Sequence, residues 1–301
     1  MKEITKEHIA AWFRDLQDRI CNGLEDLDGT SRFQEDQWER PQGGGGRTRV
    51  IKDGSLIEKG GVNFSGVEGE TPQKILDALK LPPSDFFATG VSIVLHPSNP
   101  WVPIIHMNIR YFEMSSGIWW FGGGIDLTPH YILEDKARRF HQTLKSVCDE
   151  HHQEYYPKFK SWADDYFFIP HREETRGIGG IFFDRLADGA EFDKANRWSF
   201  VKEVGNTFLP IYTEAIDQLR DRSWSEEDKQ WQKLRRGRYV EFNLVHDKGT
   251  KFGLDTNGRT ESILMSLPPE ANWAYDYQPQ TAEQKNTLSH LRKGIDWVGK
   301  Q

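Results

Sequence analysis

The clearest pattern in the chain is a strict alternation of apolar and polar residues over positions 105–111. The polar positions are His106, Asn108 and Arg110, and the positions between them are isoleucine, methionine, isoleucine and tyrosine. Successive side chains of a β-strand point to opposite faces, so this spacing places an imidazole, a carboxamide and a guanidinium in one row, backed by an apolar seam. The sequence therefore predicts a strand whose polar face forms the floor of a site.

A second alternating stretch lies a dozen residues upstream, over positions 91–96. Ser92 and His96 occupy the face opposite its apolar residues. The run 96–100 that follows it contains two prolines, a serine and an asparagine, which are typical of a turn. We therefore expect the two strands to be antiparallel neighbours with a continuous polar face.

Apolar spacing elsewhere predicts helices and further short strands. A first amphipathic helix fills 9–27 and stops at Asp28-Gly29. Later helices are expected over about 133–152, 194–222 and 226–235, with a short one from Thr71 through Leu79 that Pro82-Pro83 ends. Short strands are expected over 47–51 and 62–67, a loop is expected to begin within 119–129, and a last alternating strand is expected over 239–245.

Strands near both ends of the chain with helices inserted between them favour an α+β fold, an antiparallel sheet flanked by helices. No internal repeat, low-complexity run or composition break marks a linker in the 301 residues. We therefore expect a single domain over residues 1–301.

Composition excludes several classes of protein. The chain has 39 basic and 46 acidic residues, a net charge of −7, which disfavours nucleic acid or an anionic membrane surface as a partner. Its two cysteines, Cys21 and Cys148, are too few for a disulfide framework, which indicates a reducing compartment. The charged amino terminus lacks an apolar leader, and no segment approaches the roughly 18 apolar residues of a membrane span. A cytoplasmic protein without stable membrane insertion is predicted.

Glycine runs and histidines allow a structural and a functional interpretation. Gly43–Gly46 and Gly122–Gly124 are not followed by the lysine and hydroxyl residue of a phosphate loop, so tight turns or close backbone approach are favoured. No pair of histidines has the tight spacing of a dedicated metal site, so each one by itself fits a buried, hydrogen-bonded role better. Arg110 is different, because its strand-mates His106 and Asn108 share its face, and its planar fork suits a carboxylate.

Several longer motifs point to one family. They lie at 106–113, 119–129, 176–184 and 237–244, and the stretches 249–254 and 259–269 support them. In this order they closely resemble the oxygen-dependent coproporphyrinogen III oxidases over nearly the whole chain. Long motifs in the order of one family are far more specific than one short pattern.

The resemblance implies an activity and an assembly. The activity is the oxidative decarboxylation of two propionates of coproporphyrinogen III to vinyl groups, giving protoporphyrinogen IX in haem biosynthesis. Molecular oxygen is the implied oxidant, no organic cofactor is implied, and a divalent metal cation is implied for bacterial members. The implied protein is a homodimer, built on a large flat antiparallel sheet with helices on both faces, and its interface lies within Tyr239 to Ala274.

The resemblance also assigns roles to residues of this chain. His106 is implied as the proton donor and Asp247 as the catalytic carboxylate. Lys248 stands where the family usually has arginine, and it cannot form the same planar fork. The substrate-binding residues implied are Ser92, Asn108, Ile109, Arg110, Gly258 and Arg259, and the metal ligands implied are His96, His106, His141 and His171.

The substrate's chemistry fits these residue types. Four carboxylates on an apolar macrocycle require arginines at the rim, for which Arg110, Arg259 and Arg176 are candidates, and a flat apolar wall, for which we expect Trp119, Trp120 and Phe121. Two alternatives remain open. A metal-dependent hydrolase or oxygenase would use the histidines, and a non-catalytic tetrapyrrole-binding protein would bind the macrocycle without consuming oxygen.

Overall fold

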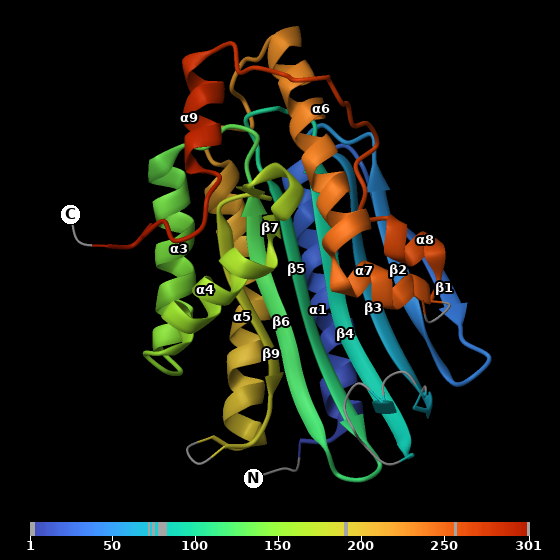
Figure 1. The fold of residues 1–301 in the computed structure, drawn as a ribbon. Coiled ribbons are helices and arrows are strands. Elements are labelled where there is room, and N and C mark those ends of the chain that lie inside the picture. The colour runs from blue at the N-terminus through green and yellow to red at the C-terminus, as the bar shows by residue number, and fades with distance from the viewer. Residues whose placement is uncertain are drawn as a thin grey trace.

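The computed structural model describes residues 4–71, 73, 76–77, 83–189, 192–255 and 258–299. Within them a seven-stranded sheet runs in the order β1-β2-β3-β4-β5-β6-β9, and every neighbouring pair is antiparallel (Figure 1). The predicted α+β fold is therefore confirmed. The strands are β1 (Gln34–Glu39), β2 (Gly44–Lys52), β3 (Ile57–Glu70), β4 (Asp85–Pro97), β5 (Ile104–Met114), β6 (Trp119–Thr128) and β9 (Gly179–Leu186).

Helices cover both faces of this sheet (Figure 1). The longer helices on one face are α1 (Lys6–Asp28), α3 (Glu134–Asp149) and α5 (Lys194–Ile216). On the other face lie α6 (Glu226–Glu241), the π-helix η2 (Phe242–His246), α7 (Lys248–Asp255) and α8 (Thr260–Leu264). The remaining elements are α4 (Tyr155–Tyr166), β7 (Phe168–Ile169), η1 (Pro170–Arg172), β8 (Glu174–Thr175) and α9 (Ala282–His290). Among the described residues, no helix is both long and apolar enough to cross a membrane.

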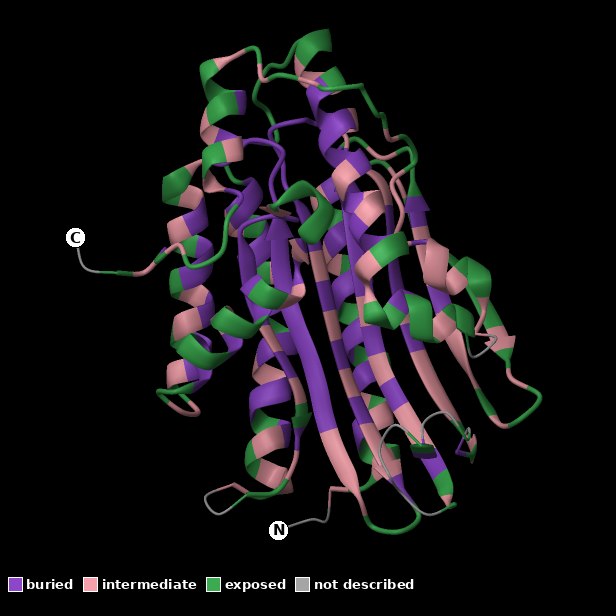
Figure 2. Cartoon of the chain, in the orientation of Figure 1, coloured by how far each residue is buried: buried purple, intermediate pink, exposed green. Residues whose placement is uncertain are grey.

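The first helix forms as its sequence predicts. The Thr5 side chain caps it by accepting a hydrogen bond from the His8 N–H at 3.3 Å. Gly29 ends it with φ at +77°, a left-handed conformation that glycine adopts without strain. Its apolar stripe, from Ile9 to Leu24, is buried against the sheet and α5. The helices that flank the sheet are buried on the side facing it and exposed on the other (Figure 2).

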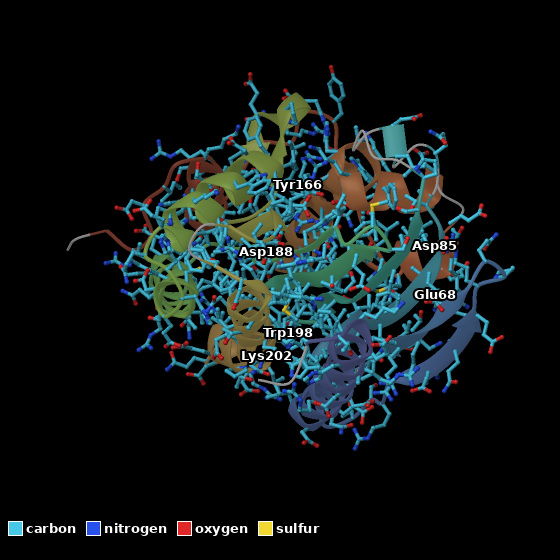
Figure 3. The ribbon with its side chains drawn as sticks, turned by 90° about the horizontal axis from the view of Figure 1, so that it is seen from below. Glu68, Asp85, Tyr166, Asp188, Trp198 and Lys202 are labelled. Carbon is cyan, nitrogen blue, oxygen red and sulfur yellow. The ribbon has the colours of Figure 1, made fainter. Side chains whose placement is uncertain are left out.

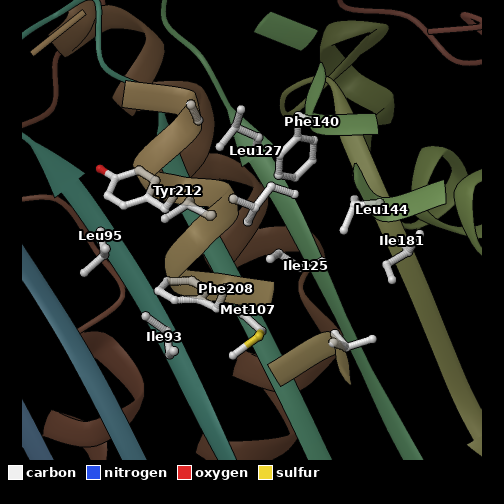
Figure 4. Packing of buried hydrophobic residues seen from close by; sticks show 14 of the residues in the cluster. Ile93, Leu95, Met107, Ile125, Leu127, Phe140, Leu144, Ile181, Phe208 and Tyr212 are labelled. Carbon is white, nitrogen blue, oxygen red and sulfur yellow. The ribbon is translucent and has the colours of Figure 1, made fainter. Parts of the chain in front are cut away.

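The apolar seam of the two alternating strands is the centre of the core. The side chains of Ile93, Leu95 and Met107 are completely buried, and Ile125 and Ile181 extend the same surface onto β6 and β9. Side chains of α5 and α3 pack on them (Figure 4). Burial of this one face fixes the register, because a slip by one residue would turn every side chain to the opposite face.

The two alternating strands are antiparallel neighbours, as predicted. Ser92 of β4 lies opposite Asn108 of β5, and Val94 lies opposite His106. The polar faces of β4 and β5 are thus continuous, and α6, α7 and α8 lie over that side (Figure 1).

Two predicted elements are wrong. Residues 119–128 form strand β6 rather than leading into a loop, since Gly122–Gly124 pair with β5, and Gly123 and Gly124 pair with β9 as well. Residues 239–245 are the end of α6 and the π-helix η2, not a strand. Tyr239, Phe242 and Asn243 are the buried residues there, and their spacing of three and four is helical. The helix predicted over 71–79 falls largely outside the described residues.

Candidate active site

The predicted polar row exists and lies under the C-terminal helices. His106, Asn108 and Arg110 all project from β5 on the face opposite the core, and Ser92 is beside Asn108 on β4. The side chain of His106 is 22% exposed and that of Arg110 is 39% exposed. The row is therefore accessible from one side while its strand is anchored from the other.

His106 is the first member of a buried polar chain. Its Nδ1 lies 2.7 Å from Asp126 Oδ1, on the neighbouring strand β6. The other oxygen of Asp126 accepts a hydrogen bond from Arg176 at 2.5 Å, and Arg176 also donates to the Asn243 side chain at 3.2 Å. Since Nδ1 is bonded to Asp126, Nε2 is the ring nitrogen left to exchange a proton with a substrate.

Arg176 is enclosed by aromatic rings. Its guanidinium carbon lies 4.3 Å from the ring centre of Phe167, 4.7 Å from Tyr239 and 4.8 Å from Phe242. The side chain is only 3% exposed, so Arg176 is not the rim arginine that the sequence suggested. Burial by itself would raise the pKa of Asp126, but the Arg176 charge and the hydrogen bond with His106 outweigh it, and the pKa lies below its usual value. Asp126 therefore favours its ionised form behind His106, with Arg176 as its counter-charge.

Arg110 lies flat on the sheet beside residues without side chains. It donates to Asp184 of β9 at 2.8 Å and to Asn108 at 2.9 Å. Gly122 faces Arg110 on β6, and a Cβ there would be 2.5 Å from the Asp184 carboxylate. Gly90 flanks Arg110 on β4. These glycines leave a flat floor on both sides of the guanidinium, which agrees with the prediction of close backbone approach.

The aromatic residues expected as a wall are divided between the two faces. Trp120 faces the site and stacks on Phe112 with ring centres 4.2 Å apart. Phe121 is completely buried on the opposite face of the sheet, under α5, where it stacks on Trp198. Trp119 contacts Phe121 edge-on on that face. The expectation that all three would share one wall is therefore wrong, because neighbours along a strand alternate.

Asp247 belongs to the layer of helices that covers the polar face of the sheet. It precedes α7, and its carboxylate accepts the Tyr166 hydroxyl at 2.8 Å and the Thr250 N–H at 2.6 Å. The ring of Tyr166 stacks at 4.2 Å on Phe182, which lies in the row of Asn108 and Gly124. Seen along the strands, Tyr166 lies on one side of the sheet, and Trp198 and Lys202 of α5 on the other (Figure 3). Asp247 and the polar row therefore share one face.

This constellation can be compared with known proteins. A protein-family model described as coproporphyrinogen III oxidase matches residues 8–297, nearly the whole chain. The chain belongs to the coproporphyrinogen III oxidase family. Its members are oxidoreductases that carry out oxidative decarboxylation in porphyrin biosynthesis, and coproporphyrinogen III is the substrate that fits this chain.

Arg259 and Gly258, which the family resemblance also assigns to the substrate, lie several strands away from the Asn108 row. Arg259 is the N-cap residue just before α8, pairs with Asp36 of β1 and donates to Ser262 at 3.1 Å. Ser262 in turn bonds Thr48 of β2 and Asn63 of β3. By strand count, Arg259 is about 14–19 Å from the Asn108 row of β5. Gly258 precedes it, and its N–H is bonded to the Gly253 carbonyl at 2.8 Å.

Ile109 and Lys248 differ from the other assigned residues in where their side chains lie. The side chain of Ile109 is completely buried and points to α5, where a Cβ on Gly205 would be 2.9 Å from it. Ile109 can therefore offer a substrate its backbone but not its side chain. Lys248 follows Asp247 as the first residue of α7 and is exposed, which leaves its ammonium free to move in solvent.

The four histidines assigned to a metal have separate environments. His96 is buried and bonded to the Ser266 carbonyl at 2.8 Å, and His141 is buried between the Tyr156 hydroxyl and the Ile178 carbonyl. His171 lies in η1, bonded to His246 and Glu241. Across the described ranges, no group of three or more histidine, cysteine or acidic side chains is placed to hold a metal ion. As placed, the four residues do not fit one metal site.

Sequence reasoning missed Asp126, Asp184, Tyr166 and Asn243. A strand over 119–128 would have revealed Asp126, since it lies opposite His106 in the ladder. Asp184 needed the second ladder, between β6 and β9. Tyr166 and Asn243 approach the site from helices 77 residues apart in the sequence, so no local pattern could indicate them.

Proposed function

We propose that this chain is an oxygen-dependent coproporphyrinogen III oxidase that needs no organic cofactor. It converts two propionates of coproporphyrinogen III to vinyl groups and yields protoporphyrinogen IX. The observation that supports this most directly is the polar row of β5 with Asp247 on the same face, in a chain that matches the family from residue 8 to 297.

The floor and walls suit a flat polyanion. Gly90, Gly122 and Gly124 leave room for a planar macrocycle beside Asn108, and Arg110 offers its guanidinium to a propionate. Arg259, about 14–19 Å across the sheet, is placed for a second carboxylate. Phe112 and Trp120 supply an apolar edge. Arg110 is paired with Asp184 and Arg259 with Asp36, so a propionate would compete with an existing partner at either arginine.

The reaction draws its electrons from the substrate. Asp247 accepts the pyrrole N–H proton, and the electron-rich ring passes an electron pair to dioxygen, forming a substrate hydroperoxide. The peroxide oxygen takes the β-hydrogen of the propionate as a proton, and the electron pair of that C–H bond moves into the ring, whose nitrogen regains a proton. The bond to the carboxylate then breaks and its electron pair forms the vinyl group, while the displaced ring electrons break the ring C–O bond and expel hydroperoxide, which takes up a proton and leaves as H₂O₂. Each turn consumes one O₂ and one propionate side chain and releases CO₂ and H₂O₂. His106, oriented by Asp126, returns the proton that the ring requires.

Oxygen consumption separates the candidate functions. We expect purified protein to form the divinyl product in air and none under argon, with one O₂ consumed per CO₂ released. A chelator should leave the rate unchanged within about twofold, because the proposed chemistry runs through no metal. Loss of activity with chelator and its return with one metal would favour the metal-dependent class instead. Stoichiometric binding without oxygen uptake would indicate a tetrapyrrole-binding protein.

We propose that the chain is a homodimer joined through Tyr239 to Ala274. Large apolar side chains gather there on the surface: Leu244, Val245, Phe252 and Trp273 are 45%, 48%, 51% and 51% exposed. Apolar groups exposed together on neighbouring elements commonly mark an interface. A cytoplasmic location belongs to the same proposal, and Cys21 and Cys148, both free and buried, agree with a reducing compartment.

Val245→Asp should convert the dimer to monomer in sedimentation or light scattering, since it adds a charge to the centre of the apolar surface. We expect the dissociation constant to rise at least about tenfold, a change of roughly 1.4 kcal/mol. Trp224→Asp is the control, because Trp224 is 47% exposed but lies outside the region. An unchanged assembly in the Val245 variant, or equal effects of both variants, would exclude this interface.

A further inference from the structure

Among the described residues, one tyrosine connects the carboxylate assigned to catalysis with a distant part of the fold. Tyr166, the last residue of α4, donates its hydroxyl to Asp247 Oδ1 at 2.8 Å, across 81 residues of sequence. The second contact of the Asp247 carboxylate is local, because Thr250 lies three residues ahead in α7 and bonds Oδ2 at 2.6 Å. A local bond keeps the carboxylate at the helix end, but it cannot set where that end lies over the sheet.

The tyrosine ring is fixed independently of its hydroxyl. It stacks on Phe182 at 4.2 Å with the planes 15° apart, and Phe167 meets it edge-on at 5.1 Å. Phe242 of η2 contacts it at 6.0 Å. These rings belong to β9, the α4 end and η2, so Tyr166 lies where the three elements meet. A phenylalanine at this position would keep every ring contact.

The hydroxyl is suited to act as a constant donor. Burial raises the pKa of Tyr166, and the negative charge of Asp247 raises it further, so the group stays protonated throughout the range in which proteins are stable. The positive charges of Arg110 and Arg176 lower the pKa of Tyr166, but burial and Asp247 outweigh them and the net shift is upward.

We propose that Tyr166 is a positioning residue, which fixes the Asp247 carboxylate over the polar row by a charge-assisted hydrogen bond. The inference rests on the proposed role of Asp247. The geometry assigns the tyrosine no contact with the reacting atoms. It determines the direction in which the carboxylate presents its free lone pairs to the pyrrole N–H. A hydrogen bond to a charged group is among the stronger ones in proteins, so its loss should be measurable in turnover.

The decisive variant is Tyr166→Phe, measured by steady-state kinetics in air. We expect kcat to fall about tenfold or more while KM changes less than about twofold, because orientation is lost and the floor that binds the macrocycle is not. A purely structural role would instead lower the amount of folded protein and leave the kcat of the folded fraction unchanged.

Tyr131→Phe is a matched control. Tyr131 donates to Asp228 at 2.7 Å, the same type of bond, but it packs against Trp101 and Trp231, away from the polar row. Both variants remove one hydroxyl from a tyrosine–aspartate pair, so their thermal midpoints should fall by similar amounts. Only the Tyr166 variant should lose kcat. Equal kcat values for the wild type and both variants would overturn the proposal.

A double-mutant cycle separates this inference from the proposed role of Asp247. In an Asp247→Asn background, Tyr166→Phe should lower the residual kcat by less than about twofold, since the group it positions is already gone. A full tenfold loss in that background would show that Tyr166 acts through something else. If Asp247→Asn alone keeps normal turnover, both assignments fail. If it loses turnover and Tyr166→Phe does not, only the positioning role fails.

Discussion

Replacing Asp247 with asparagine should lower kcat at least about 100-fold, the range measured for the removal of a general base. Asparagine has nearly the size of aspartate and is as good a residue at the start of a helix, so α7 should keep its first turn. Its amide can still accept the Tyr166 hydroxyl, but it cannot take up a proton from the pyrrole. The measurement is product formation in air at saturating substrate, beside a binding assay that confirms an occupied site.

Asp255→Asn is the control for this experiment. Asp255 ends the same helix α7 and is exposed, so its substitution changes the net charge equally without touching the site. We expect its kcat to match that of the wild type. Turnover near the normal value in the Asp247 variant, with substrate bound, would remove Asp247 from the mechanism. Alanine at the same position should lose turnover as well, together with the helix cap.

Asp126→Asn should have the largest effect on stability. The carboxylate is 2% exposed, and its loss leaves the Arg176 guanidinium buried among aromatic rings without a counter-charge. Breaking a buried ion pair in this way costs about 3–5 kcal/mol. Asparagine has one neutral acceptor oxygen where Asp126 serves both His106 and Arg176, so the charged acceptor that fixes the His106 ring is lost and turnover should fall at least about tenfold in the fraction that remains folded. Urea unfolding measures the loss of unfolding free energy, and steady-state kinetics measures the fall in turnover.

Asp15→Asn provides the comparison for a surface pair. Asp15 bonds Arg19 at 2.8 Å one helical turn away, and its side chain is 63% exposed. Exposed pairs of this type contribute about 0–1 kcal/mol, so the free energy of unfolding should hardly change. If the Asp126 variant lost no more than the Asp15 variant, the buried chain would not be a stabilising element of the site.

The same pair predicts a pH dependence of stability. The pKa of Asp126 is lower in the folded protein than its usual value of about 3.9, since burial raises it but the Arg176 charge and the hydrogen bonds with His106 and Arg176 together lower it by more. Its contribution is therefore fully present above a pH of about 4 and is lost as the pH falls through the folded pKa. The Asp126→Asn variant should lack this part of the acid destabilisation. The difference in unfolding free energy between wild type and variant should narrow as the pH falls below about 4.

Much of the fold follows from local patterns. Alternation over 91–96 and 105–111 predicted the two central strands, their pairing and the direction of the polar row, because burial of one face forbids a shift of register. Helical spacing predicted α1, α3, α5 and most of α6. Strand β9 and the strand character of 119–128 were missed. Both are rich in glycine and largely buried on both sides, so they show no alternation that a sequence pattern could reveal.

The strand predicted over 239–245 was wrong for a different reason. Its residues alternate in polarity as a strand would, yet α6 is already a helix when the chain reaches Tyr239, and each further residue adds a hydrogen bond without a new nucleation cost. Tertiary contacts then decided which residues are buried: Tyr239 and Phe242 surround Arg176, and Leu244 and Val245 remain on the surface.

The sequence by itself determined the family, the polar row and the identity of its three side chains. Only the tertiary structure decided that Arg176 is a buried counter-charge and not a rim residue, and that Asp126 orients His106. Only the tertiary structure also placed Tyr166 on Asp247 and left the four histidines apart. Patterns along a chain report which face a side chain occupies. They carry no information about which distant element covers that face, and burial, ion pairing and partner choice are all set by that covering.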